Sequence, residues 1–190
     1  MTTRPRTVLA WHFLPANGCL ARSAPPVKVE VGRTYRVDGE PVLCEHGLHG
    51  SLGVLDALKY AHSPIVCRVR IGGKIVRGDD KLCGTTRRVL AMADAGPTLH
   101  LFACWCAERA LKAERKAGRE PDARSWAALE VKRRWIAGEA TDAELAAARA
   151  AARAAVGAAG AAGAAAWAAA WAAQNRKLTA MLRALLRGRK

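Results

Sequence analysis

Hydrophobic and polar positions alternate in the first third of the chain and predict short β-strands. Thr7–Phe13 and Val27–Val37 have the character of strands, and Pro41–Cys44 is a shorter apolar run. In Ile65–Ile71 every second residue is apolar and arginines stand between them. This period of two is typical of a strand with one buried face.

Turn and helix signals lie between these strands. Gly72 and Gly73 predict a tight hairpin that leads into Lys74–Arg77. Ser51 is placed to cap a helix that continues to His62, and Thr98 to cap a longer helix that ends near Gly118. These elements predict an α+β fold, in which helices pack on a small, mostly antiparallel sheet.

The remainder of the chain has helical signals throughout. A helix from Asp122 ends at Gly138, and Thr141 with Glu144 forms a capping box that opens an alanine-rich helix reaching Leu186. Glycines at positions 157, 160 and 163 weaken this helix, so the sequence leaves open whether it is continuous or bent. We therefore expect a compact domain at 1–118, a helix and turn at 119–140 and an alanine-rich basic tail at 141–190.

Positive charge is in excess along the chain and is strongest at its end. The sequence has 31 Lys and Arg against 16 Asp and Glu, a net charge of +15. Six basic and no acidic side chains occur in the last 17 residues, namely Arg176, Lys177, Arg183, Arg187, Arg189 and Lys190. Such a segment attracts polyanions, so nucleic acid or an acidic host protein is one expected partner. A solvated helix face is the alternative, and the apolar seam Trp167–Leu186 would then pack on the domain or on a second copy in a homo-oligomer.

Membrane insertion and secretion are not expected. Residues 154–175 carry no charge and are long enough to cross a bilayer, but they contain no Leu, Ile or Phe. No convincing secretory signal precedes Cys19, so we expect six reduced cysteines and a cytoplasmic protein.

A glycine-flanked histidine is the most distinctive motif. Gly47-Leu48-His49-Gly50 is followed by Leu55-Asp56-Ala57-Leu58-Lys59-Tyr60 and by the strand step Cys67-Arg68-Val69. In these features, and in an Ala/Trp-rich tail with Gln174-Asn175-Arg176-Lys177-Leu178, the chain resembles an uncharacterised family of bacteriophages and prophages. That resemblance implies no established activity, and it implies the host cell cytoplasm as the location.

A more distant resemblance carries a mechanistic expectation. Trp11-His12 on the first strand and the Gly-x-His step before a helix are similar to the core of ADP-ribosyltransferases of the poly(ADP-ribose) polymerase type. The resemblance implies NAD as the cofactor, with His12, His49 and Tyr60 lining its pocket, and His49 and Asp80 as catalytic residues. The chain departs from that family because His49 replaces a stacking tyrosine and no glutamate stands on a late strand. An enzyme of this type and a non-enzymatic binding protein therefore remain two alternatives.

Two further chemistries have weaker support. Cys44, His46 and His49, with Cys104 and Cys106, are residues that zinc prefers, but their spacings are not those of a zinc knuckle, so no metal site is expected. A nucleophilic pair of Cys44 with a histidine rests on even less, because the chain has five histidines to choose from.

Arginines on the polar side of one predicted strand have two interpretations. Arg68 and Arg70 alternate with the apolar residues of Ile65–Ile71. They are able to hold a phosphate group, or they form the solvated side of the sheet. The sequence has no glycine-rich phosphate loop to set beside them.

Overall fold

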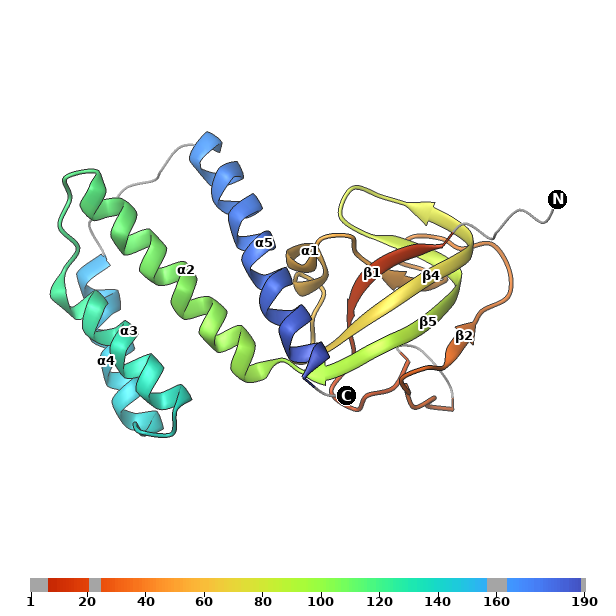
Figure 1. Cartoon of the computed structure of the whole chain (residues 1–190), viewed down its shortest axis with the longest axis horizontal. Helices are drawn as coiled ribbons and strands as arrows, with labels where there is room; N and C mark the ends of the chain where they lie inside the picture. Colours follow the sequence, from red (N-terminus) through yellow and green to blue (C-terminus); the bar gives the residue numbers. More distant parts are fainter. Residues whose placement is uncertain (1–6, 21–24, 157–163, 189–190) are drawn as a thin grey trace. The chain divides into compact units, whose positions relative to one another are not determined.

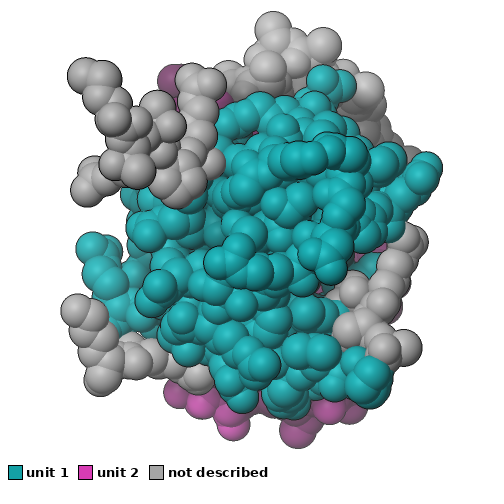
Figure 2. Space-filling view, turned by 90° about the vertical axis from the view of Figure 1, so that its right-hand side faces the viewer, with its two compact units in different colours: residues 1–96, 178–190 teal, residues 97–177 magenta. Residues whose placement is uncertain are grey.

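The chain folds into two compact units, each described here by itself. The computed structural model describes residues 7–20, 25–156 and 164–188. Unit 1 consists of residues 1–96 and 178–190, and unit 2 of residues 97–177 (Figure 2). The division falls after Gly96, inside the stretch 1–118 that the sequence pattern predicts to be one compact domain.

Unit 1 is built on an antiparallel sheet of five strands. The strands are β1 (Val8–Phe13), β2 (Thr34–Arg36), β3 (Leu48–Gly50), β4 (Ile65–Arg77) and β5 (Leu82–Asp94). They lie in the order β1-β4-β5-β2 (Figure 1), and β3 pairs with the first three residues of β5, Leu82–Gly84. The expected α+β fold with a small antiparallel sheet is confirmed.

The sheet closes on itself beside β3. The backbone N–H of Trp11 donates to Ser51 O at 2.8 Å, and the N–H of Ser51 donates back to Trp11 O at 2.9 Å. These two bonds join β1 to the residue after β3, so that β1, β4, β5 and β3 form a ring. Apolar side chains fill its inner side: Ala10, Leu14, Val29, Tyr35, Leu48, Cys67, Val69, Ile71, Leu82 and Val89. A Cβ at Gly50 would come within 2.9 Å of Ile71 Cδ1, so a glycine is needed at this close approach.

Two helical segments complete unit 1. One is the single-turn helix α1 (Val54–Leu58), which contacts β1. The other is the C-terminal part of α5 (Ala164–Arg187), where Leu178 and Leu182 are completely buried. The end of the predicted apolar seam is thus covered within the chain.

Unit 2 is helical. It contains α2 (Gly96–Lys116) from Pro97 onward, α3 (Ala123–Ile136), α4 (Asp142–Val156) and the first part of α5. The capping box expected at Thr141 is present, but the caps predicted at Ser51 and Thr98 are wrong, because α1 has Gly53 as its N-cap and α2 already begins at Gly96. Asp122 accepts a hydrogen bond from the N–H of Arg124 at 2.8 Å, and Glu144 N–H donates to Thr141 Oγ1 at 3.2 Å while Glu144 Oε2 accepts from the N–H of Thr141 at 2.7 Å. Leu129 and Leu145 are buried where α3 and α4 pack.

The predicted hairpin at Gly72 and Gly73 is wrong. β4 continues through both glycines, and the pairing register with β5 shifts between Gly72 and Ile75, as in a β-bulge. The chain turns later, where the N–H of Gly78 donates to Lys81 O at 2.9 Å. The two glycines therefore lie at an irregularity within β4, and they do not form the turn that reverses the direction of the chain.

Three other predicted elements are shorter or different. The strand predicted at Val27–Val37 is limited to β2, and Pro41–Cys44 lies in a turn region instead of a strand. The helix predicted from Ser51 to His62 is the single turn α1. The glycines at 157, 160 and 163 lie outside the described residues, so the continuity of the alanine-rich helix stays open. Within the part of the chain that the structure describes, no helix is both long enough and apolar enough to span a bilayer.

Candidate functional site

The outer face of the sheet in unit 1 carries arginines. Side chains alternate along a strand, and Cys67, Val69 and Ile71 of β4 point into the core. The two residues between them, Arg68 and Arg70, therefore point outward, as their sequence pattern predicts.

The neighbouring elements add further guanidinium groups to this face. Arg88 of β5 is paired directly with Arg70, and it lies between the buried residues Arg87 and Val89. Arg36 follows the inward Tyr35 on β2. From α5, the positive charge of Arg183 lies close enough to act on Arg68. We call these five residues the arginine face: Arg36, Arg68, Arg70, Arg88 and Arg183.

Arg68 is held in a fixed position within the arginine face. Its guanidinium carbon lies 4.6 Å from the ring centroid of Trp11, the residue opposite it on β1. Its Nη1 atom is buried and has no hydrogen-bond partner in the structure. Burial, together with the charge of Arg183, lowers the pKa of Arg68. Arg68 thus lies beside a second positive charge, with one of its N–H groups buried and unpaired.

The arginine face has no carboxylate to neutralise it. Among the described residues, none of its five members takes part in an ion pair. Acidic residues of unit 1 are engaged elsewhere: Glu30 pairs with Arg33 at 3.3 Å, and Glu40 pairs with Lys74. Asp94, the one acidic residue within the five strands, accepts a hydrogen bond from the N–H of Gly96 at 2.7 Å.

The two histidines of the expected NAD pocket lie on different faces of the sheet. His12 follows the inward Ala10 by two residues on β1, and its Nε2 atom is buried without a hydrogen-bond partner among the described residues. His49 stands between Leu48 and Gly50, which both face the core, so its own ring faces the other way. There His49 Nε2 accepts a hydrogen bond from the backbone N–H of Cys44 at 3.1 Å.

A buried arginine accompanies His12 inside the sheet. Arg87 is 3 % exposed, and its Nη1 donates to the backbone oxygen of His49 at 2.9 Å, while its Nε has no partner. Burial, then the charges of Arg87 and His49, hold the pKa of His12 well below its ordinary value. Burial also lowers the pKa of Arg87 to about 10. His12 is therefore a neutral interior group at physiological pH.

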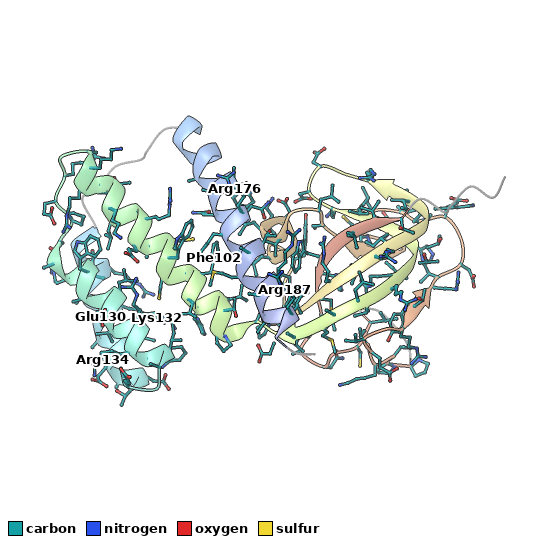
Figure 3. The ribbon with its side chains drawn as sticks, in the orientation of Figure 1. Phe102, Glu130, Lys132, Arg134, Arg176 and Arg187 are labelled. Atoms are coloured by element: carbon teal, nitrogen blue, oxygen red, sulfur yellow. The ribbon has the colours of Figure 1, made fainter. Side chains whose placement is uncertain are left out.

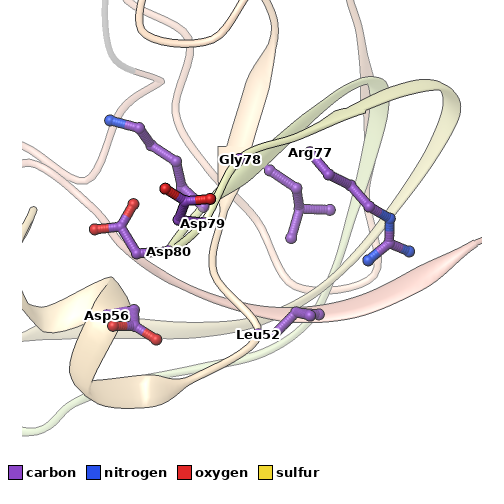
Figure 4. A pocket seen from close by; sticks show the side chains of 8 residues that line it. Leu52, Asp56, Arg77, Gly78, Asp79 and Asp80 are labelled. Atoms are coloured by element: carbon purple, nitrogen blue, oxygen red, sulfur yellow. The ribbon is translucent and has the colours of Figure 1, made fainter.

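Asp80 and Tyr60 lie together at the tip of the β4–β5 hairpin. Tyr60 Oη donates to Asp80 Oδ2 at 2.8 Å, and Lys59 Nζ lies 3.4 Å from the same oxygen. The hydrogen bond from Tyr60 is the main reason why the pKa of Asp80 is lowered. A hollow of about 60 Å³ here is lined by Asp56, Asp80 and neighbouring residues (Figure 4), and neither His12 nor His49 lines it.

The basic residues predicted as an anion-binding tail are divided between the two units. Arg183 and Arg187 belong to unit 1, whereas Arg176 and Lys177 belong to unit 2. Figure 3 labels Arg176 and Arg187, which both lie on α5. The Lys177 ammonium lies 5.8 Å from the ring centroid of Trp105. The other two members, Arg189 and Lys190, lie outside the described residues.

The residues weighed as zinc ligands do not form a cluster. In the described stretches of the chain, no three His, Cys, Asp or Glu side chains are placed to hold a metal ion. His46 is engaged through Nε2 with the backbone oxygen of Asp38 at 2.5 Å. Cys104 and Cys106 lie on α2, in the other unit.

Comparison with known proteins gives a family without an assigned activity. Residues 19–100 match the model of a family described as a domain of unknown function, DUF7666. No curated protein and no solved structure matches the chain. The matched stretch holds β2 to β5, and with them four of the five members of the arginine face.

Three members of the arginine face were predicted from the sequence: Arg68 and Arg70 on one strand, and Arg183 in the tail. Arg36 and Arg88 were missed, because their strands were not predicted with the observed bounds. Arg88 lies in the segment Thr-Thr-Arg-Arg-Val at positions 85–89. Thr86 and Arg88 are the two polar residues there that alternate with inward positions, and this alternation was the signal for Arg88. The buried Arg87 hides that alternation, since an arginine at an inward position is rare.

Proposed function

We propose that the protein is a non-enzymatic binding protein whose arginine face engages the phosphate groups of nucleic acid. The observation that supports this most strongly is five clustered guanidinium groups with no carboxylate partner among the described residues. The proposal develops one of the two functions that the sequence predicts, but it moves the binding surface from the tail to the sheet.

The arrangement of the arginines favours an anionic ligand. Arg70 and Arg88 are directly opposite on antiparallel strands, a position in which like charges destabilise a sheet. Arg68 and Arg183 are a second pair of like charges, and one of them is partly buried. A bound polyanion would relieve both repulsions.

Several guanidinium groups on one rigid surface suit the regularly spaced phosphates of nucleic acid. All five cations of this face are arginines, whose planar fork donates two parallel hydrogen bonds to a phosphate. They lie on paired strands and an adjoining helix, so they are spaced along a rigid surface. Repeated phosphates on a nucleic acid backbone suit such a surface, and they would bind it with little regard to sequence.

The NAD-dependent transferase stays a prediction of the distant resemblance. His12 is an interior group, and the ring of His49 lies on the other face of β3. Asp80 is engaged with Tyr60 and Lys59. The described residues therefore add no support of their own to NAD binding.

Paired substitutions of equal charge test the proposal. In the full chain, Arg70→Gln with Arg88→Gln removes two charges from the arginine face, whereas Arg33→Gln with Arg77→Gln removes two exposed charges from elsewhere in unit 1. Binding to a fluorescent DNA duplex and to a single strand of the same length is measured by anisotropy at low salt. We expect the first pair to weaken binding by about 10- to 100-fold, as loss of two phosphate contacts does at low ionic strength, and the control pair by less than about threefold.

Two results would contradict the proposal. One is a protein that binds neither nucleic acid at 50 mM salt, at about micromolar concentrations where nonspecific binders are detected. The other is equal weakening by the two pairs, which would mean that net charge acts without any defined face.

A further inference from the structure

An arginine lies buried inside the ring of strands without a carboxylate beside it. Arg87 is 3 % exposed, and its strand partners Ile71 and Tyr35 both point into the core, so its own side chain points there too. Its Nη1 donates to the backbone oxygen of His49 at 2.9 Å, while its Nε is buried and has no partner among the described residues. No ion pair within the described parts of the chain includes Arg87.

His12 brings a second unpartnered nitrogen to the same interior. It is paired with Cys67, which points into the core, so the imidazole lies on the inner side of the sheet as well. Its Nε2 atom is buried and has no hydrogen-bond partner in the described structure. The residue as a whole is half-buried, so another part of it remains in contact with solvent. The interior is thus reachable from the surface beside this ring.

Strand pairing brings the two side chains close together within the ring. Two backbone hydrogen bonds join Trp11 to Ser51. Because the two segments run antiparallel, His49 lies opposite the residue that follows His12. The Arg87 guanidinium, which donates to the oxygen of His49, is therefore about one residue step of roughly 3.3 Å from the level of His12. Burial and then the charge of Arg87 lower the pKa of His12, as this proximity requires.

An anion from solution would supply what this interior lacks. Burial lowers the pKa of Arg87 only to about 10, so the guanidinium keeps its charge at physiological pH. A charge in an apolar interior is costly unless it is paired, and so is an unsatisfied polar group. The inward side chains next to His12 are small, namely Ala10 two residues before it and Cys67 opposite it. A single small anion suits these neighbours better than a polyatomic oxyanion, which needs more than two donors.

We propose that a chloride ion binds inside the ring of strands, where it accepts hydrogen bonds from Arg87 Nε and from His12 Nε2. Arg87 supplies the positive charge and one N–H group. His12 supplies the second N–H group while it is neutral, with its proton on Nε2. The bound ion neutralises the buried guanidinium, so it stabilises the folded chain and has no counterpart in the unfolded one. This site lies on the inner side of the sheet and is independent of the arginine face on the outer side.

The melting temperature of the full chain in matched salts tests this site. Thermal unfolding is measured at about pH 8, where His12 is neutral. The two buffers contain sodium chloride and sodium gluconate, each at about 150 mM, so that surface charges are screened equally. If the dissociation constant for chloride is about tenfold below this concentration, the melting temperature should be about 3–6 °C higher in chloride. Sodium bromide should act as chloride does, because bromide has the same charge and a similar size.

Substitutions separate a defined chloride site from a general effect of salt. Arg87→Met removes the buried charge and should abolish the difference in melting temperature between the two salts, and His12→Leu should reduce it. Arg77→Met, at an exposed arginine of β4, is the matched control and should keep the full difference.

Two results of the melting experiment would overturn the proposal. One is a parent chain with equal melting temperatures in the two salts, and the other is an equal difference in Arg87→Met and Arg77→Met. If Arg87→Met does not fold, the width of the chloride NMR signal decides. The parent chain and Arg77→Met should broaden this signal, and added bromide should narrow it again. Equal broadening by His12→Leu and the parent chain would contradict the site.

Discussion

At the scale of single residues, the interior of unit 1 holds two ionisable groups that most cores exclude. Arg87 is buried with one hydrogen bond to His49 O, and His12 lies near enough for the charge of Arg87 to lower its pKa. Both are enclosed by a ring of strands that is otherwise filled with apolar side chains. Protonating His12 would add a second positive charge there, so acid should destabilise the folded protein through this residue.

The free energy of unfolding should therefore depend on pH through His12. Its pKa is lowered in the folded protein, whereas the unfolded chain has the ordinary value of about 6.5. Below about pH 6.5 the unfolded chain takes up a proton that the folded one refuses, so stability is lost at up to about 1.4 kcal/mol per pH unit. Above that pH the contribution is fully present. Urea unfolding between pH 5 and 8 measures this.

Two histidine variants identify the residue responsible. His12→Gln should remove most of this slope, while His62→Gln, at an exposed histidine, should keep it. If both variants lose stability with acid as steeply as the parent chain, another group is responsible.

Gly84 is required by close packing within the ring. A Cβ there would lie 2.7 Å from both Gly72 O and Ile71 Cγ2, and the backbone oxygen has no freedom to move aside. Gly84→Ala should therefore destabilise the protein by about 1–3 kcal/mol, the usual cost of overpacking. In Gly188→Ala the nearest atom is 3.8 Å away, so this control should be near neutral. Thermal unfolding of the two variants decides the matter, and equal melting temperatures would refute it.

At the scale of elements, the C-terminal part of α5 belongs to the core of unit 1. Leu178 and Leu182 have no exposed surface. Removal of the tail from residue 141 onward would therefore strip unit 1 of part of its core, and a truncated chain would not test the tail alone. Point substitutions are the sound way to examine it.

Shortening one buried side chain measures how much α5 contributes to the stability of the protein. Leu182→Ala should lower the free energy of unfolding by about 2–5 kcal/mol, as buried leucines do. Leu101→Ala, at a leucine of α2 that is 46 % exposed, should cost much less. Comparable losses in chemical denaturation would mean that the burial of Leu182 contributes no more to stability than an exposed leucine does.

The capping box at the start of α4 can be tested by substitution of Thr141. Thr141 and Glu144 exchange hydrogen bonds at 3.2 and 2.7 Å, as the capping box in the sequence predicts. Thr141→Ala should cost about 1 kcal/mol, whereas Thr141→Ser should cost little because it keeps the hydroxyl acceptor. The helical signal in circular dichroism during thermal unfolding is the measurement, and identical curves for the two variants would contradict the assignment.

Local signals predicted local structure well and long-range structure poorly. The capping box at Thr141 and the alternation in β4 were predicted correctly, because each depends on neighbours in sequence. The bulge at Gly72 was not, because the same glycines suit a turn, and only pairing with β5 decides between the two. The arginine face was predicted only in part for the same reason. Arg68 and Arg70 share one strand, whereas Arg88 joins them only through the pairing of β4 with β5.

At the scale of the whole molecule, the charge of each unit matters more than the net charge of +15. In unit 1, carboxylates gather at the β4–β5 turn, where Asp56 and Asp80 meet Lys59. The outer face of the sheet keeps its guanidinium groups without a carboxylate partner in the described chain. This separation within one unit is what a surface for a polyanion requires.

The salt dependence of DNA binding by the full chain tests this account most directly. Five arginines that each neutralise a phosphate predict that the logarithm of the association constant falls with the logarithm of salt concentration at a slope of about −4.5 for a duplex. With Arg70→Gln and Arg88→Gln the slope should become shallower by about 1.8, and with Arg33→Gln and Arg77→Gln it should stay near that of the parent chain. A slope close to zero, or one that the first pair of substitutions leaves unchanged, would contradict phosphate binding by the arginine face.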